Sequence, residues 1–166
     1  MEIAESAPTP APISVCPVIT GLGCVSPLGC DVPATREALK SGRDGISAVR
    51  LFPVGTFQFR TAGQVPAELD EVCDGLHAAS CDWPRSAKLV FLAMHEALAS
   101  RPGFVPDVVV AGTTSGGMDF GESFFRGLAS GMSQRMARRR VRGYVPQQPV
   151  LEAMERAMVT AKAHAA

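Results

Sequence analysis

The side chains best suited to chemistry in this chain are its thiols and imidazoles. The thiols belong to Cys16, Cys24, Cys30, Cys73 and Cys81, and the imidazoles belong to His77, His95 and His164. No two cysteines form a Cys-x-x-Cys pair, and no histidine stands at ligand spacing from a cysteine, so the pattern does not indicate a structural zinc site. The spacing also offers no Ser/His/Asp or Cys/His arrangement for nucleophilic catalysis. We therefore assign no catalytic residue and no metal ligand from these side chains.

Two glycine-rich turns are the next candidates for chemistry. The first contains Gly21 and Gly23, but a dinucleotide-binding fingerprint would need glycine or alanine where the chain has Ser26. The second surrounds Ser115, but its spacing is not the Gly-x-Ser-x-Gly pattern of a hydrolase nucleophile. Neither turn is followed by the Gly-Lys-Ser/Thr of a phosphate-binding loop. The small residues of the second turn are better explained by a tight bend that a neighbouring element approaches closely.

A third feature is a local group of basic residues. It consists of Arg135, Arg138, Arg139, Arg140 and Arg142. Two interpretations stay open: a solvated helix face, or a docking patch for an acidic partner or a phosphate-bearing arm. Single-stranded nucleic acid is disfavoured because Tyr144 is the only aromatic residue nearby.

Composition narrows the class of protein further. The chain has 166 residues, is 46% hydrophobic, and carries 16 basic against 16 acidic residues, so no overall field draws it to nucleic acid. Only 19% of its residues are charged, which indicates that part of its surface faces more protein. Residues 1–14 have the composition of a disordered leader, and no apolar run is long enough to span a bilayer. An odd number of cysteines without a secretory signature predicts reduced thiols and a cytoplasmic location.

These residues are positioned by a predicted series of strands and helices. Strands are expected at Val15 to Thr20, at an edge position over Thr61 to Val65, and at Val108 to Ala111, with a turn over Asp44 to Ile46. Helices are expected at Pro33 to Ser41 with an Asp31 cap, at Asp82 to Ser100 with an Asp82 cap, at 119–129, at 132–140, and from Pro149 onward. Apolar residues occupy most of the circumference of the longest helix, so we expect it to be covered on nearly all sides. These residues are Leu89, Val90, Ala93, Met94, Ala97 and Leu98. The order predicts a layered α/β fold, with a mainly parallel sheet between helices and a site at Gly21–Gly29 and Gly112–Gly117.

The amino-acid sequences of several segments resemble those of one known family. The run VITGLGCVSPLG (residues 18–29) is similar to the opening strand and turn of β-ketoacyl-acyl-carrier-protein synthases, and ALKSGRDGI (38–46) to the helix and turn that follow. The stretch from Arg85 to Leu98 resembles the family's long second helix. GTTSGGM (112–118) resembles its next core loop, and YVPQQP (144–149) the approach to the nucleophile segment. The resemblance runs from about Val15 to Val150, with the motifs in the family's order.

The resemblance implies a thiolase-like fold, of which this chain would form an incomplete N-terminal half, and assembly as a homodimer or heterodimer. It implies decarboxylative Claisen condensation of acyl and malonyl thioesters in fatty-acid or polyketide synthesis. The phosphopantetheine arm would arrive on an acyl carrier protein, so the chain itself needs no cofactor. The family's catalytic cysteine and two histidines match no position here. Only Ser115 is carried over, as a residue of the loop that borders the acyl pocket.

Residues 15–166 are accordingly expected to form a partial synthase domain that stops before the nucleophile and is inactive alone. The alternative, from another class, is a non-catalytic interaction or chain-length subunit of a synthase heterodimer. A third explanation is an interrupted gene or a partial sequence, because the segment after Pro149 does not resemble the family's continuation.

Overall fold

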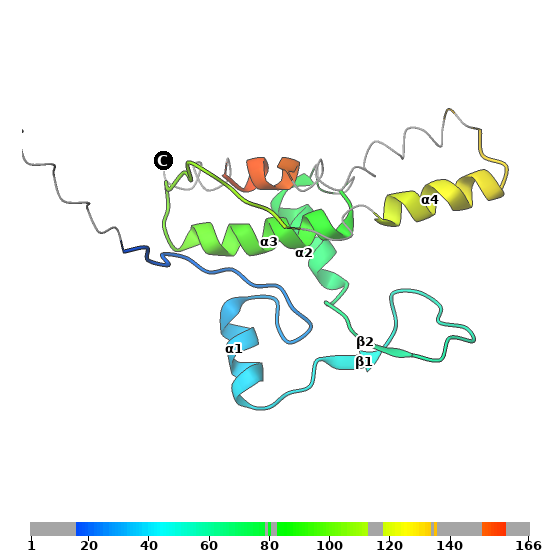
Figure 1. The fold of residues 1–166 in the computed structure, drawn as a ribbon, viewed down its shortest axis with the longest axis horizontal. Coiled ribbons are helices and arrows are strands. Elements are labelled where there is room, and N and C mark those ends of the chain that lie inside the picture. The colour runs from blue at the N-terminus through cyan, green and yellow to red at the C-terminus, as the bar shows by residue number, and fades with distance from the viewer. Residues whose placement is uncertain are drawn as a thin grey trace, which may run out of the picture.

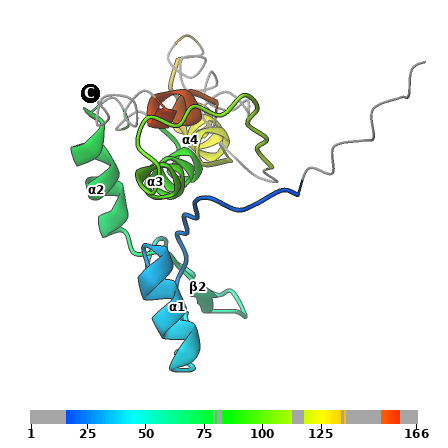
Figure 2. The same ribbon diagram turned by 90° about the vertical axis from the view of Figure 1, so that its left-hand side faces the viewer.

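The computed structural model describes residues 16–78, 80, 83–112, 118–133, 135 and 151–158. In chain order, these contain α1 (Val32–Lys40), β1 (Ile46–Ala48), β2 (Thr61–Gly63), α2 (Glu68–Leu76), α3 (Arg85–Ala99) and α4 (Met118–Ala129). Residues 151–158 form a further short helix. Figure 1 and Figure 2 show α2, α3 and residues 151–158 grouped together, with α1 and the two strands to one side of them.

The local signals for α1 act as predicted. Asp31 is the N-cap, and its Oδ1 accepts a hydrogen bond from the Ala34 N–H at 2.7 Å. Proline in the first turn costs nothing there, because that N–H has no partner inside the helix. Gly42 ends the helix with φ +66°, a conformation that glycine adopts without strain. The predicted helix and its cap are confirmed.

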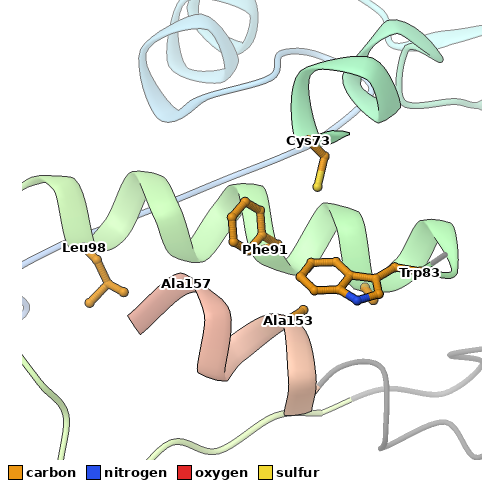
Figure 3. Close-up of a cluster of buried hydrophobic side chains, with 7 residues drawn as sticks. Cys73, Trp83, Phe91, Leu98, Ala153 and Ala157 are labelled. Atoms are coloured by element: carbon orange, nitrogen blue, oxygen red, sulfur yellow. The ribbon is translucent and has the colours of Figure 1, made fainter. Parts of the chain in front are cut away.

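The core lies where three helical segments meet. Phe91 and Ala87 of α3 are fully buried, and Cys73 of α2 covers them from one side. Ala153 and Ala157 of the 151–158 helix cover them from another side (Figure 3). Trp83 completes the cluster, and its ring meets the Phe91 ring edge-on with 5.6 Å between centroids. Small residues on the terminal helix allow it to approach α3 closely.

Helix α3 is covered as predicted, but its beginning differs. No residue from Arg85 to Leu98 is exposed, which confirms that the helix is enclosed on nearly all sides. The helix begins at Arg85 rather than Asp82, and the N-cap is Pro84, which gives no side-chain hydrogen bond. The predicted Asp82 cap is therefore wrong, and Asp82 itself lies outside the described residues. Arg85 donates instead to the carbonyls of Val65 and Pro66, at 2.8 and 2.9 Å, and pairs with Asp70 of α2.

The prediction of a mainly parallel sheet is wrong for the described residues. Their sheet has two strands, β1 and β2, which pair antiparallel with Ile46 opposite Gly63. The predicted strands over Val15 to Thr20 and Val108 to Ala111 are absent from the described part of the chain. The reason is physical: a strand persists only where neighbouring strands satisfy its backbone groups, and no described segment pairs with either run. The edge strand expected at Thr61 to Val65 is present as β2.

Two further differences concern helices. The sequence signals did not predict α2, since no element was expected between Val65 and Asp82. Helix α4 confirms the helix expected at 119–129. The helix expected at 132–140 falls almost entirely outside the described residues, whereas residues 151–158 lie within the helix expected after Pro149.

Candidate functional site

The first predicted site region, the turn at Gly21–Gly29, lies on α3. Glu96, half-buried on α3, accepts two backbone hydrogen bonds, one at each carboxylate oxygen. Its Oε2 accepts from the Cys24 N–H at 2.9 Å, and its Oε1 accepts from the Val32 N–H at 2.8 Å. One carboxylate thus fixes both the turn after the first apolar run and the beginning of α1. Charge-assisted hydrogen bonds of this kind are stronger than neutral ones.

Glycine is required in this turn for close packing. A Cβ on Gly23 would lie 1.8 Å from the Ala93 carbonyl oxygen, and one on Gly21 would lie 2.4 Å from the Ala97 carbonyl oxygen. Both contacts are with the backbone of α3, which cannot move aside as a flexible side chain would. The two glycines therefore bring the turn against the helix backbone and leave no space there for a bound group.

The next residues form a self-contained turn. Ser26 and Gly29 exchange backbone hydrogen bonds of 2.9 and 3.2 Å around Pro27. The Ser26 hydroxyl accepts from the Leu28 N–H at 3.2 Å and lies 3.1 Å from the hydroxyl of Thr35 on α1. These contacts use the hydroxyl to hold the turn against α1, so Ser26 has a structural role.

The second predicted site residue, Ser115, falls outside the described residues, as does the rest of 113–117. The described part of that loop ends at Gly112, which is exposed, and a Cβ there would meet no atom within 4 Å. The role given to Ser115 stays a prediction. Most of the basic group at 135–142 lies outside the described residues too.

A polar cluster, formed by Cys73, Asp74, Ser80 and Lys88, lies where α2 meets α3. Lys88, buried on α3, pairs with both carboxylate oxygens of Asp74, at 2.8 and 2.9 Å. The fully buried Ser80 hydroxyl donates to the same carboxylate. These two hydrogen bonds, the lysine first, lower the pKa of Asp74. Asp74 is therefore ionised at neutral pH and joins the two helices.

The thiol in this cluster is unsuited to nucleophilic chemistry. Burial raises the pKa of Cys73 more strongly than its hydrogen bond with Ser80 and the charge of Lys88 lower it. A thiol, rather than a thiolate, is present at neutral pH, and the thiolate is the reactive form. The ring of His77 stacks with the Phe91 ring, with 6.1 Å between centroids, and its Nε2 is buried without a hydrogen-bond partner. The cluster therefore stabilises the packing of α2 on α3 rather than forming a catalytic pair.

Neither the Glu96 contacts nor this cluster was predicted from the sequence. A signal was present in both cases, because a charged residue within an otherwise apolar helix requires a partner when the helix is buried. Lys88 is such a residue, because the structure buries it on α3. The other described thiols, Cys16, Cys24 and Cys30, are free.

A shallow apolar hollow lies beside the Ser26 turn. It is lined by Ser26, Pro27, Leu28, Arg43, Asp44, Gly45, Ile46 and Gly63. A Cβ on Gly45 would lie 3.1 Å from the Leu28 side chain and 3.2 Å from the Pro27 side chain. The hollow therefore marks where the Ser26 turn approaches the beginning of β1. Only Arg43 and Asp44 could offer charged groups to a ligand.

The described residues hold no group of three or more His, Cys, Asp or Glu side chains that could bind a metal ion. Within the same residues, no helix is long and apolar enough to cross a membrane. No protein-family model matches the chain, and no curated protein matches it either.

Proposed function

We propose that this chain forms the N-terminal part of a condensing enzyme related to the β-ketoacyl-acyl-carrier-protein synthases. In this proposal it provides scaffold, and the catalytic cysteine and histidines come from further polypeptide. The assembled enzyme would join an acyl group to malonyl on an acyl carrier protein by decarboxylative Claisen condensation. The proposed reaction rests on the sequence resemblance to this family from Val15 to Val150.

The observation that carries the proposal is the exposure of two apolar runs. The first apolar segment (residues 16–22) exposes Val18, Ile19 and Leu22, with Ile19 81% exposed. The second apolar segment (residues 104–110) exposes Phe104, Val105, Val108, Val109 and Val110, with Val110 90% exposed. Water disfavours such contiguous apolar surface, and soluble proteins cover it with further protein. Both segments are β-branched runs with the composition of buried strands.

The position of the first apolar segment supports this interpretation. The end of the segment is fixed to α3 by the close contact of Gly21, and the residues that follow it are fixed there by Gly23 and by Glu96. The Ser100 hydroxyl at the end of α3 also lies 3.4 Å from the Thr20 carbonyl oxygen. Figure 1 shows the second apolar segment turning back after α3 ends. The proposal interprets this anchored apolar segment as a strand whose neighbouring strands come from further polypeptide.

The test begins with the DNA beyond the codon for Ala166, read in all frames. The proposal expects a helix-forming segment with a cysteine in an alanine-cysteine-small-residue context, and two later histidines. Co-expression of that polypeptide with this chain should then yield a complex that converts acyl- and malonyl-carrier protein into β-ketoacyl product. Each polypeptide alone should give none. Absence of such a segment, or an unrelated continuation, would contradict the proposal.

A second candidate is a non-catalytic subunit of a synthase heterodimer. It is favoured by the same exposed segments together with the low content of charged residues, 19%. The two candidates differ in partner. A heterodimer subunit should be recovered with a full-length synthase that already has its own nucleophile, whereas the first candidate requires the missing part of the fold.

A further inference from the structure

The connection between β1 and β2 gathers exposed aromatic side chains. This hairpin loop (residues 49–60) exposes Leu51, Phe52, Phe57 and Phe59, of which Phe59 is 80% and Phe57 68% exposed. It lies on a different part of the molecule from the two apolar segments. Figure 1 shows it projecting from β1 and β2, away from α2 and α3.

The hairpin loop is held in a defined shape at its base. The Val49 N–H donates to the Arg60 carbonyl at 2.9 Å. The Gln64 side chain accepts from the Arg50 and Leu51 N–H groups, at 2.9 and 3.2 Å, and donates to the Ala48 carbonyl at 2.9 Å. These bonds close the loop on itself, so its apolar side chains are presented outward by an ordered backbone.

A second turn orders the tip. The Phe57 N–H donates to the Val54 carbonyl at 2.9 Å, and Gly55 supplies the positive φ of +48° between them. A Cβ on Gly55 would meet no atom within 4 Å, so the tip stands clear of the rest of the chain.

The charge of this region is of one sign. Between Asp44 and Glu68 the sequence has no acidic residue, and its only charged side chains are Arg50 and Arg60. Both arginines are exposed, one at each end of the hairpin loop. Aromatic residues flanked by arginines match the boundary of an anionic bilayer, where rings enter the headgroup and acyl region and guanidinium groups meet phosphates.

We propose that the hairpin loop docks on an anionic lipid surface. Phe57 enters the interface at the tip and Phe59 enters it nearer the base, where Arg50 and Arg60 pair with lipid phosphates. A projecting loop with few charges suits insertion into a bilayer. The proposal stands on observations independent of the condensing-enzyme proposal.

The test is sedimentation with vesicles of phosphatidylcholine alone and of phosphatidylcholine with phosphatidylglycerol in equal amounts. The chain should sediment with the mixed vesicles and be released by salt, which screens the arginines. Phe57→Gln with Phe59→Gln should lower the partition coefficient on mixed vesicles about tenfold or more. Arg50→Gln with Arg60→Gln should lower it about tenfold.

The matched control is Phe125→Gln on α4, a ring that is 67% exposed outside the hairpin loop. It should leave partitioning within about twofold of the original chain, because the arginine beside it, Arg126, is paired with Glu122. Circular dichroism of each variant establishes that it folds. The proposal is overturned by no binding to mixed vesicles, by equal binding to phosphatidylcholine alone, or by equal loss in the Phe125 control. It is also overturned if the hairpin variants abolish recovery of a protein complex and leave vesicle binding intact.

Discussion

At the scale of single residues, Glu96 joins three segments of the chain through one carboxylate. It supplies both acceptors that hold the Cys24 turn and the start of α1 on α3. Glu96→Ala should lower the free energy of unfolding by about 2 to 3 kcal/mol, because two N–H groups lose a charged acceptor. Urea unfolding followed by circular dichroism measures this change.

The control for this prediction is Glu37→Ala on α1, where the carboxylate is exposed. That change should stay within about 0.5 kcal/mol. Equal effects of the two substitutions would show that Glu96 does not hold the turn.

The burial of the Cys73 thiol should make the folded chain lose stability at alkaline pH. Its pKa is raised in the folded chain by burial, so folding stabilises the protonated thiol. That contribution is complete below the unfolded value of 9.0 and is lost as the pH rises through the folded value. The free energy of unfolding should therefore fall above about pH 9. In the Cys73→Ala variant, the free energy of unfolding should fall less steeply over the same pH range. Parallel pH profiles of the two chains would contradict the assignment.

The ion pair of Asp74 with Lys88 should make the folded chain lose stability in acid. Its pKa is lowered in the folded chain by the hydrogen bonds from Lys88 and then Ser80, so folding stabilises the carboxylate. This contribution is present above the unfolded value of 3.8 and is lost as the pH falls through the folded value. Asp74→Asn should be less stable than the original chain at pH 7, and the difference should shrink in acid. A difference that is the same at pH 7 and in acid would mean that the ion pair with Lys88 contributes nothing.

Residue types alone predicted part of the candidate site. The Gly21–Gly29 turn was selected from its residue types, because the glycines and the apolar run before them are local signals. The contacts of Glu96 and Lys88 could not be predicted in this way, because each joins residues that are distant in the chain and meet only when α3 is packed. Ser115 was selected by resemblance and lies outside the described residues.

At the scale of elements, the contact of the Gly21–Gly23 turn with α3 can be tested by a matched pair of glycine substitutions. Gly23→Ala should destabilise the chain by about 2 kcal/mol or more, because its Cβ would lie 1.8 Å from the Ala93 carbonyl oxygen. Gly75→Ala in α2 meets no atom within 4 Å and should stabilise by about 0.5 to 1 kcal/mol. Thermal unfolding compares the two. Equal tolerance of alanine at both positions would show that the turn does not lie against the helix.

Helices were easier to predict than strands for a physical reason. The beginnings and ends of α1 depend on Asp31 and Gly42, which lie beside the helix in the sequence. A strand depends on neighbours elsewhere in the chain, so the composition of the Val108 run indicated a strand without supplying a partner. Helix α2 was missed because its buried positions, Leu69 and Cys73, are only two in a polar segment.

At the scale of the whole molecule, the two apolar segments determine how the chain behaves in solution. Contiguous exposed β-branched residues favour association. Val108→Thr with Val110→Thr should reduce light scattering on incubation by at least about twofold, because both side chains are exposed and make the second segment apolar. The same change at Val72, which is exposed on α2, should have little effect. An equal reduction in light scattering by both changes would indicate nonspecific hydrophobic association rather than association through the second apolar segment.

The central claim is that the two apolar segments are strands of a sheet that further polypeptide completes. Amide hydrogen exchange tests it most directly, because a ladder hydrogen bond slows exchange at each paired N–H. The account predicts fast exchange over residues 16–22 and 104–110 in the chain alone. It predicts strong protection of both segments in complex with a polypeptide that supplies the rest of the proposed sheet, or with a synthase subunit. Protection in the chain alone, or no gain of protection in the complex, would contradict it.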